Sequence, residues 1–525
     1  MKLNFPATAK LTDAISGESL DLNQLSARVT EWQQQLQAFA AKRVLLLSPG
    51  NLEWALLDLA CLDSNTLLVP VPTYLSEAQL QHILNSVKPD LIFSSNELFL
   101  DGFRQVGKFH NLYAYQYQKA LQPLQLPADC QKITFTSGST GTPKGVCLSA
   151  ATQLQVAQSL VERIAIKAPR HLCLLPLSTL LENIAGIYAP LLAGGEVLLS
   201  DEFQRGFHGS SLAEPKKLLD LISSTQPQTL ILVPELLQLL VQACQQGWQP
   251  PASLLFIAVG GAVVAPQLLA LAAKAGLPVY QGYGLSECGS VVALSEVNAA
   301  TASLEDLASV GKPLSHLQVK LVAGELWVKT PFLGYLSDFT GQTDAQPDVL
   351  PGEQPQARQQ AMAADETQGW VATGDLALML SDGRLQIKGR KKNLLISSLG
   401  RNINPEWVEA ELLKNGLLQQ AVLVGDARPY CSALLYCANP AINNSQIKNW
   451  LAQVNETLPD YARVQRFYRL STPLSETNGT LTANQRPKRS QIAELYQAQI
   501  AALYTNDAVT DSVQSDLVAP ASAAC

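Results

Sequence analysis

Short runs of apolar residues alternate with segments in which apolar residues recur at helical spacing. The runs at residues 44–47 and 67–71 predict buried strands, and the segment at 52–61 between them predicts a helix. A helix at 77–87 and a strand at 90–93 follow in the same manner. Because strands and helices alternate, the pattern predicts an α/β fold with mainly parallel sheets that carry helices on both faces.

One hydrophobic segment, residues 254–273, is long enough to imitate a membrane-spanning helix. Gly260 and Gly261 interrupt it, and Pro266 suits the first turn of a helix rather than its interior. We therefore predict a buried strand at 254–259, a glycine turn and a helix that begins near Pro266. This interpretation replaces the membrane span.

A domain boundary is predicted near Gly389. Before it, residues 376–387 have the pattern of a hairpin that turns at 381–383. After it, a helix, a strand and a second helix are predicted, enough for a compact α+β domain of about 100 residues. The chain is therefore divided into a large domain at 1–389 and a small one at 390–505.

Two segments lack any periodic spacing of hydrophobic residues. Residues 336–368 are rich in Gln, Asp, Pro and Ala, and they predict an exposed loop. Residues 506–525 are rich in Ala, Ser, Asp and Val, and they predict a disordered tail.

Composition is that of a large soluble enzyme. The chain has 525 residues, of which 47% are hydrophobic, so it can bury more than one core. Its 37 basic and 44 acidic residues give a net charge of −7, so no nucleic-acid partner is expected. The nine cysteines include no CxxC pair and the five histidines lie far apart. With no apolar run typical of a signal peptide at the start, this indicates reduced thiols and a cytoplasmic protein, without a histidine metal site.

The densest chemical signal is TSGSTGTPKG at residues 136–145. Its glycines let the backbone approach an anion closely, and successive N–H groups can line a concave nest. Lys144 adds a point charge suited to phosphate. The apolar, strand-like residues 133–135 before it argue against a flexible linker, and Pro143 before Lys144 departs from the common P-loop pattern. We predict a phosphate-binding loop of another kind.

This loop resembles the phosphate loop of the adenylate-forming (AMP-binding) enzymes, which include acyl-CoA synthetases, luciferase-like ligases and peptide-synthetase adenylation domains. The resemblance extends from about residue 20 to about residue 489, and long-chain fatty acyl-CoA synthetases are closest in appearance. The other motifs occur in the family's order: VGGA at 259–262, QGYGLSE at 281–287, GELWV at 324–328, TGD at 373–375 and GRKK at 389–392.

The resemblance implies a fold and a set of cofactors. A large adenylation domain with a β-rich subdomain would be followed by a small mobile lid that pivots at Lys392. ATP, Mg²⁺ and coenzyme A would be the cofactors. A carboxylate must then attack the α-phosphorus of ATP, which requires cationic stabilisation and precise positioning.

The same resemblance assigns roles at the nucleotide. Lys144 and the loop backbone would hold the β- and γ-phosphates, while Glu287 and the Thr136 hydroxyl would bind Mg²⁺. Tyr283 would stack on adenine, and Asp375 would accept both ribose hydroxyls. The expected nucleotide-binding set is Thr136, Ser137, Gly138, Ser139, Thr140, Gly141, Thr142, Lys144, Gly261, Ala262, Gln281, Gly282, Tyr283, Gly284, Ser286, Asp375 and Arg390.

The chain departs from the family near its C-terminus. Family members place a catalytic lysine in a segment that here is NGTLTANQRPKR, residues 478–489. By register Arg486 takes the place of that lysine, and Lys488 follows two residues later. Both stay candidates beside Lys144 and Glu287; we favour Arg486, with Lys488 and Arg489 as a solvated basic pair.

The substrate is indicated by the segment at 174–186, which resembles the acyl-pocket motif of long-chain fatty acyl-CoA synthetases. Thr179 replaces the usual histidine, and Leu180, Leu181 and Ile184 are candidate pocket residues. The predicted function is ATP-dependent activation of a medium- or long-chain fatty acid with pyrophosphate release, then transfer to coenzyme A. A fatty substrate would also allow peripheral contact with a membrane. Two alternatives stay open: loading of acyl groups onto a carrier-protein thiol, and nucleotide binding with weak catalysis.

Overall fold

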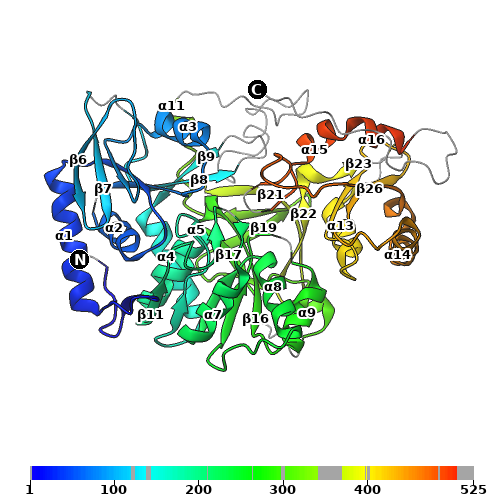
Figure 1. Ribbon diagram of the computed structural model, residues 1–525, viewed down its shortest axis with the longest axis horizontal. Coiled ribbons are helices and arrows are strands. Elements are labelled where there is room, and N and C mark those ends of the chain that lie inside the picture. Colours follow the sequence, from blue (N-terminus) through cyan, green and yellow to red (C-terminus); the bar gives the residue numbers. More distant parts are fainter. Residues whose placement is uncertain are drawn as a thin grey trace. The chain divides into compact units, whose positions relative to one another are not determined.

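The computed structural model describes residues 3–64, 66–119, 124–137, 143–209, 211–262, 264–296, 302–340, 369–396, 398, 402–482 and 485–504. These residues form two compact units (Figure 1). The N-terminal unit comprises the described residues up to Thr373 together with Ala377–Ile387, and the C-terminal unit comprises Gly374–Leu376 and the described residues from Lys388 on. The division at Lys388 is adjacent to Gly389, where the sequence predicts a boundary.

The first layer of the N-terminal unit is a seven-stranded sheet in the order β6-β7-β5-β3-β4-β8-β9. Its central strands β3, β4 and β5 are parallel, because helices carry the chain back between them. The strands are β3 (Arg43–Leu47), β4 (Leu67–Val71), β5 (Leu91–Ser94), β6 (Phe103–Phe109), β7 (Leu112–Tyr117), β8 (Cys130–Ser137) and β9 (Pro143–Ser149), and the helices are α1 (Leu22–Ala38), α2 (Leu52–Leu62) and α3 (Glu77–Val87).

A nine-stranded sheet forms the second layer, in the order β18-β17-β16-β15-β14-β10-β11-β1-β2. The six central strands of this order, from β16 to β1, pair in parallel. The strands β17 and β18 at one end and β2 at the other form antiparallel pairs. The strands are β1 (Lys10–Asp13), β2 (Ser19–Leu20), β10 (Arg170–Leu172), β11 (Glu196–Leu199), β14 (Thr229–Leu232), β15 (Phe256–Val259), β16 (Val279–Leu285), β17 (Ser290–Leu294) and β18 (Lys312–Pro313).

Helices flank this sheet, as the alternating pattern predicts, so the α/β class is confirmed. The hydrophobic segment at 254–273 is a strand, a glycine turn and a helix that begins at Pro266. Among the described residues, no helix has the length and apolar character needed to cross a membrane. The helical elements are α4 (Ala150–Ile164), α5 (Leu180–Glu182), the π-helix η1 (Asn183–Tyr188), α6 (Ala189–Leu192), α7 (Pro215–Thr225), α8 (Pro234–Gln245), α9 (Pro266–Lys274), the 3₁₀-helix η2 (Ser286–Cys288), α10 (Leu304–Leu307) and α11 (Ser337–Thr340).

Two smaller sheets complete these layers. A hairpin joins β12 (Phe207–His208) to β13 (Ser211–Leu212), and a four-stranded sheet has the order β19-β20-β21-β22. The second of these comprises β19 (Gln318–Val322), β20 (Glu325–Lys329), β21 (Trp370–Met379) and β22 (Leu385–Arg390). The hairpin predicted at 376–387 is present between β21 and β22, where the Leu380 amide donates to the Arg384 carbonyl at 2.8 Å.

Local sequence explains where several helices begin. Asp21 and Ser76 form capping boxes with Gln24 and Gln79, which satisfies two otherwise unpaired donors at each helix start. Pro266 occupies the first position of α9, where its missing N–H has no cost.

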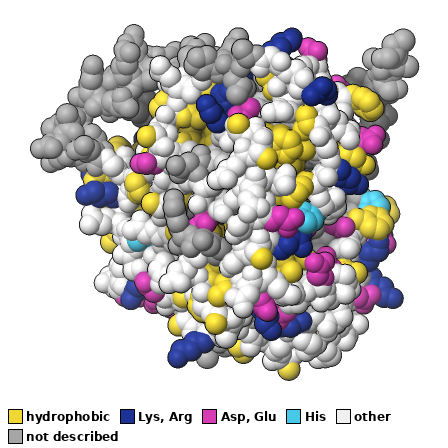
Figure 2. Space-filling model, turned by 90° about the vertical axis from the view of Figure 1, so that its left-hand side faces the viewer, with side chains coloured by type: hydrophobic (Ala, Val, Ile, Leu, Met, Phe, Trp, Pro, Cys, Tyr) yellow, Lys and Arg dark blue, Asp and Glu magenta, His cyan; other side chains and the backbone are white. Residues whose placement is uncertain are grey.

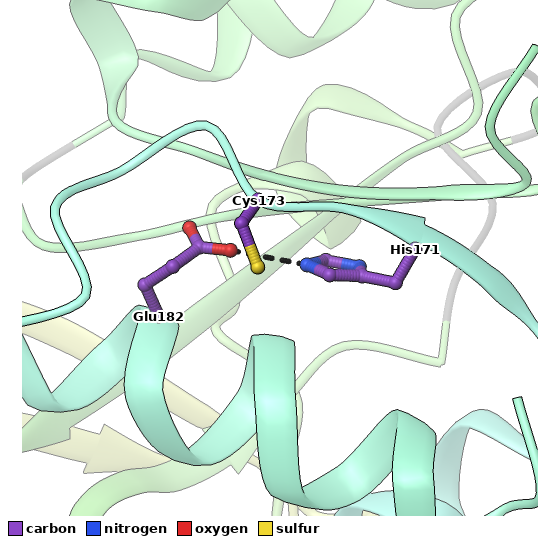
Figure 3. Close-up of side chains that lie close together, drawn as sticks. All are labelled: His171, Cys173 and Glu182. Atoms are coloured by element: carbon purple, nitrogen blue, oxygen red, sulfur yellow. Dashed lines mark hydrogen bonds and ion pairs between the residues drawn. The ribbon is translucent and has the colours of Figure 1, made fainter. Parts of the chain in front are cut away.

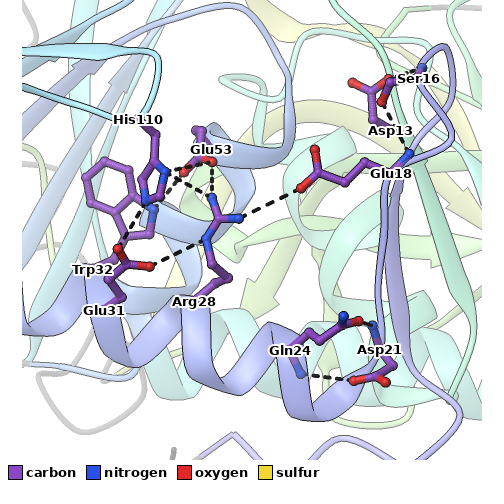
Figure 4. Close-up of polar contacts among 10 residues, drawn as sticks. All are labelled: Asp13, Ser16, Glu18, Asp21, Gln24, Arg28, Glu31, Trp32, Glu53 and His110. Carbon is purple, nitrogen blue, oxygen red and sulfur yellow. Dashed lines mark hydrogen bonds and ion pairs between the residues drawn. The ribbon is translucent and has the colours of Figure 1, made fainter.

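A polar cluster fixes α1 against α2 (Figure 4). Arg28 pairs with Glu53, and the indole Nε1 of the buried Trp32 donates to the other oxygen of that carboxylate at 2.9 Å. His110 lies 3.5 Å from Glu31 at the same place. On the face shown in Figure 2, basic and acidic side chains of the described residues are interspersed, so the charge of that face is mixed.

The C-terminal unit is an α+β domain with its own hydrophobic core. Its three-stranded sheet has the order β25-β26-β27, antiparallel and then parallel. The elements are the 3₁₀-helix η3 (Lys391–Asn393), β23 (Leu395–Ile396), β24 (Asn402–Ile403), α13 (Pro405–Leu413), β25 (Gln420–Val424), β26 (Cys431–Tyr436), α14 (Asn444–Thr457), the 3₁₀-helix η4 (Asp460–Ala462), β27 (Val464–Arg469), α15 (Arg489–Leu495) and α16 (Gln497–Ala502).

One prediction about an irregular segment is wrong at its start. Residues 336–368 were expected to form an exposed loop, but Leu336 is buried and α11 follows it. Leu336 packs in the core of the seven-stranded layer, because its amide is bound by the Gly145 carbonyl of β9 at 2.8 Å. The rest of that segment, from 341 to 368, and the tail predicted at 506–525 lie outside the described residues.

Candidate active site

The predicted phosphate loop connects two strands of the seven-stranded sheet. Strand β8 ends at Ser137 and β9 begins at Pro143, and Thr136 is paired with Lys144 across the hairpin. The Thr136 hydroxyl lies 3.5 Å from the Lys144 carbonyl, and the Lys144 side chain is half-buried. Rigid strands therefore carry both ends of the loop. The loop residues Gly138, Ser139, Thr140, Gly141 and Thr142 lie outside the described residues.

Glu287 is held beside this hairpin by a tyrosine that the motifs did not reveal. The Tyr335 hydroxyl donates to Glu287 Oε1 at 2.6 Å. The Tyr335 backbone forms an isolated bridge with Val146 of β9, so it connects the strand of Lys144 to the 3₁₀-helix η2 that carries Glu287. In the sequence, the position of Tyr335 directly after a glycine is the only hint of this role. That glycine, Gly334, has a φ of +111°.

The candidate adenine-binding residues lie on adjacent strands. Val259, at the end of β15, pairs with Gln281 of β16, and Gly261 and Ala262 follow β15 directly. Gly261 has a φ of +81°, a left-handed conformation that glycine adopts without strain. The Gln281 side-chain oxygen is enclosed and accepts no hydrogen bond from any described residue. An acceptor without a donor suits a ligand that brings an N–H group.

Strand β16 has no room for a side chain at Gly284, one of the glycines of the motif. A Cβ at Gly284 would lie 1.6 Å from the Ser290 carbonyl oxygen of β17, so this position excludes every side chain. A bulge between Tyr283 and Gly284 re-aims the strand at this point. Ser286 begins the 3₁₀-helix η2 next to Glu287. The motif QGYGLSE is thus a strand end, a bulge and a tight turn that delivers Glu287.

Asp375 and Arg390 form an ion pair inside the C-terminal unit. The Arg390 Nε lies 2.7 Å from Asp375 Oδ1, and the aspartate side chain is 5% exposed. Gly374, with a φ of +72°, precedes the aspartate. Because Arg390 uses one carboxylate oxygen, the orientation of the carboxylate is defined before any ligand binds.

Lys392 lies in the 3₁₀-helix η3, close to the division between the two units at Lys388. Gly389, three residues earlier, has a φ of +131°, and a Cβ there would lie 2.6 Å from the Asn404 amide nitrogen. The chain is therefore closely restrained before Lys392.

Arg486 and Lys488 lie on a short hairpin whose ends are held by backbone hydrogen bonds. The Thr482 amide donates to the Arg486 carbonyl at 2.9 Å, and the Lys488 amide donates to the Thr480 carbonyl at 2.9 Å. Arg486 is exposed and Lys488 is half-buried.

The prediction made for Arg489 is wrong. It was expected to belong to a solvated basic pair, but its two terminal nitrogens bind the two oxygens of Glu409 at 2.9 and 2.7 Å. Burial raises the pKa of the Glu409 carboxyl, and the charge of Arg489 acts against this shift. The bidentate pair joins α15 to α13, so Arg489 has a structural role that sequence register did not indicate.

The segment that resembles an acyl-pocket motif is mostly internal. Thr179 precedes α5 and its hydroxyl donates to the Pro176 carbonyl at 2.6 Å. Leu180 and Ile184 are buried in the main hydrophobic core, and Leu181 packs against it. The described structure thus places these side chains against other core residues.

A buried polar network adjoins this segment and was not predicted. Lys132 Nζ lies 2.7 Å from Asp58 Oδ1, and the two side chains are 3% and 0% exposed. Tyr188 and Asn183 of the π-helix donate to the other Asp58 oxygen at 2.6 and 2.9 Å. Burial lowers the pKa of Lys132, and the charge of Asp58 acts against this shift. Widely spaced residues form this network, so no motif signals it.

Comparison with known proteins identifies the family. Residues 14–336 match the AMP-binding enzyme family, and residues 392–508 match the AMP-binding enzyme C-terminal domain. Since the first match spans more than half of the chain, the protein belongs to the AMP-binding, adenylate-forming enzymes, as its motifs indicated.

Relatives narrow the class of reaction. The long-chain-fatty-acid–CoA ligase FadD15 of Mycobacterium bovis is 24% identical over 570 residues, which cover 89% of this chain and 89% of the relative. The 2-succinylbenzoate–CoA ligase of Enterococcus faecalis is 28% identical over 470 residues, which cover 86% of this chain and 90% of the relative.

A solved structure shows the same fold. O-succinylbenzoate coenzyme A synthetase (MenE) from Bacillus subtilis, in complex with ATP and a magnesium ion, aligns with a TM-score of 0.68 at 21% identity, over 92% of this chain and 96% of the other. With the family matches and the relatives, this makes the protein an adenylate-forming enzyme of the acid–CoA ligase type.

Proposed function

We propose that the protein uses ATP and Mg²⁺ to convert a fatty acid to its acyl-adenylate and then transfers the acyl group to coenzyme A. The observation that carries this proposal is the placement of Glu287 beside the phosphate-loop hairpin through Tyr335. The strand that carries Lys144, the turn that carries Glu287 and Tyr335 are connected there, which supports a site for nucleotide phosphates and a cation.

The residues present fit the proposed cofactors. Glu287 and the Thr136 hydroxyl are hard oxygen ligands of the kind that Mg²⁺ prefers, and bound Mg²⁺ would neutralise phosphate charge. The Tyr335 hydroxyl bonds one oxygen of Glu287 and so orients the carboxylate. Lys144, at the end of the loop, would bind phosphate oxygens as a point charge.

The chemistry has two balanced steps. In the first, a carboxylate oxygen of the acid bonds to the α-phosphorus of ATP while the bond from that phosphorus to pyrophosphate breaks. In the second, the thiolate sulfur of coenzyme A bonds to the acyl carbon and AMP leaves. Lys144 would hold the departing phosphates in the first step, where repulsion between anions is the main obstacle.

Residues of the C-terminal unit would complete the reaction. Asp375, which pairs with Arg390, would accept the ribose hydroxyls. Arg486 would take the place of the family's catalytic lysine, with Lys488 as the alternative. Lys392, near the division between the units, would be the pivot of the lid between the two steps.

The proposal also specifies which carboxylic acid is the substrate. A fatty acid is supported by the segment at 174–186 and by the similarity to FadD15. 2-Succinylbenzoate is the second candidate, because its ligase from Enterococcus faecalis has the higher identity of the two relatives. A carrier-protein thiol is the alternative acceptor of the acyl group. Nucleotide binding with weak catalysis is the alternative activity. We also infer a cytoplasmic location, since the cysteines in the described part of the chain are free thiols.

Acid-dependent exchange of pyrophosphate into ATP tests the first step, with a panel of medium- and long-chain fatty acids and 2-succinylbenzoate. We expect exchange with fatty acids, loss of it in Lys144→Ala, and a thioester product only when coenzyme A is added. Exchange with 2-succinylbenzoate alone would transfer the proposal to that acid. Wild-type exchange in Lys144→Ala would contradict the assignment of the loop.

A further inference from the structure

A second group of chemically active side chains lies in the N-terminal unit, in and beside the segment at 174–186. His171, Cys173 and Glu182 point toward one another (Figure 3), and one ligand atom from each lies within 4.8 Å of the others. His171 Nε2 is 3.0 Å from Glu182 Oε1. The histidine is 2% exposed, and the cysteine and glutamate are fully buried.

The fold explains why these side chains meet. His171 and Cys173 are two residues apart along an extended segment, so both side chains are directed to the same face. The chain then turns and returns as α5, whose last residue is Glu182. The π-helix η1 begins directly afterwards, and π-turns inside helices are frequent at functional sites.

Surrounding groups orient the histidine and the glutamate. The Thr229 hydroxyl lies 2.9 Å from His171 Nδ1, which leaves Nε2 directed at the cluster. The Leu175 amide donates to Glu182 Oε2 at 3.1 Å and leaves Oε1 directed at the cluster. Partners of this kind fix the tautomer of a histidine ligand and the rotation of a carboxylate ligand in metal sites.

Charge balance also favours a cation. The Glu182 carboxylate is fully buried beside His171 and Cys173, and a buried carboxylate needs a partner of opposite charge or a metal ion. A divalent cation would supply positive charge there, because it deprotonates a coordinating thiol and neutralises thiolate and carboxylate together.

The available space suits a small tetrahedral ion. Zinc bond lengths to nitrogen, oxygen and sulfur give ligand-to-ligand separations of about 3.3–3.6 Å in a tetrahedron. The separation of 3.0 Å between His171 and Glu182 must open slightly, and the others must close from at most 4.8 Å. The Gly186 carbonyl, 3.6 Å from Cys173 Sγ, is a candidate for the fourth ligand.

We propose that His171, Cys173 and Glu182 form a buried structural zinc site that ties β10 to the α5–η1 segment. Zinc is favoured because it accepts nitrogen, sulfur and oxygen ligands together and needs no redox partner. Complete burial of the ligands fits a structural site rather than a catalytic one. This site is separate from the proposed Mg²⁺ ligands Thr136 and Glu287, so it holds whether or not the proposed substrate is correct.

The test is the metal content of the purified full-length chain. We expect about one zinc per chain by mass spectrometry in the wild type, retention in Cys61→Ser, and at least a roughly tenfold loss of zinc affinity in Cys173→Ser. Cys61 is a matched control because it is equally buried in the same unit. A wild-type protein without zinc, or equal zinc in the two variants, would overturn the proposal.

A second measurement does not depend on the folding of Cys173→Ser. Wild-type protein refolded with Co²⁺ in place of zinc should show the near-ultraviolet absorption of a thiolate bound to cobalt. Glu287→Gln should retain this band, because Glu287 belongs to the other site. Absence of the band in the wild type, or its loss in Glu287→Gln, would contradict a site built on Cys173.

Discussion

The Tyr335 hydroxyl donates a hydrogen bond of 2.6 Å to Oε1 of Glu287. The backbone of this tyrosine bridges to Val146 in β9, two residues after Lys144. One residue thus connects the strand that carries Lys144, the proposed phosphate-binding lysine, to the turn that carries the proposed metal ligand. In the proposed function, the second oxygen of Glu287 would bind Mg²⁺.

Substitutions of this pair should separate a metal ligand from a residue that orients it. Glu287→Gln removes the negative charge that would bind Mg²⁺, and we expect a loss of roughly 10²-fold or more in pyrophosphate exchange. Tyr335→Phe should cost about tenfold, largely by raising the Mg²⁺ concentration required for half-maximal rate. Tyr280→Phe is a matched control, because its ring stacks on Phe256 at 4.7 Å and the phenylalanine keeps that contact. An unchanged Mg²⁺ requirement in Tyr335→Phe would refute the orienting role.

The two candidates for the missing lysine can be ranked by alanine substitution. Arg486 is exposed, and its guanidinium keeps the positive charge of the family's lysine. We expect Arg486→Ala to depress acyl-adenylate formation far more than Lys488→Ala, while thioester formation from supplied acyl-adenylate is nearly unchanged. The two rates would be measured by pyrophosphate exchange and by thioester release. The opposite ranking would assign the role to Lys488, and no effect of either would favour a weakly catalytic nucleotide-binding protein.

A proline at the proposed pivot should uncouple the two steps. Proline fixes φ near −65° and disfavours helical backbone at the preceding residue, which here is Lys391 of η3. Lys392→Pro should therefore leave acyl-adenylate formation largely intact and slow thioester formation strongly. Lys392→Ala, which removes the side chain and leaves the backbone free, should retain both steps. Equal loss of the two steps in Lys392→Pro would indicate a folding defect instead.

The buried pair Lys132–Asp58 predicts a large effect on stability. Lys132→Met would leave the Asp58 carboxylate buried without its cation, at a cost of about 3–5 kcal/mol. Adding Asp58→Asn to this variant should recover part of the loss, because no charge then remains buried. Calorimetric unfolding of the full chain would measure both. Lys217→Met is a control because the ion pair of Lys217 with Glu214 is accessible to solvent, so its effect should stay below about 1 kcal/mol. A change in Lys132→Met as small as in the control would show that the pair is not buried as described.

Much of the fold could be predicted from the sequence because its signals are local. The apolar run at 67–71 and the periodic segment at 77–87 correspond to β4 and α3 with the same bounds. The capping residue Ser76 and the N-terminal Pro266 mark helix starts without reference to the rest of the chain. The family motifs were recognisable for the same reason, since each is contiguous.

Contacts between distant residues could not be predicted. Tyr335 and Glu287 are 48 residues apart, and Arg489 and Glu409 are 80 apart, so no spacing connects them. The expected solvated state of Arg489 was wrong because its buried partner is supplied by another helix.

The sequence by itself determined the alternation of strands and helices and the family, since these depend on the order of neighbouring residues. The tertiary structure decided which polar groups are buried together. Asp58 with Lys132, and His171 with Cys173 and Glu182, are close only because packed sheets and helices bring them there. Burying such groups requires partners of fitting charge, and those partners are determined by the packing of the whole unit.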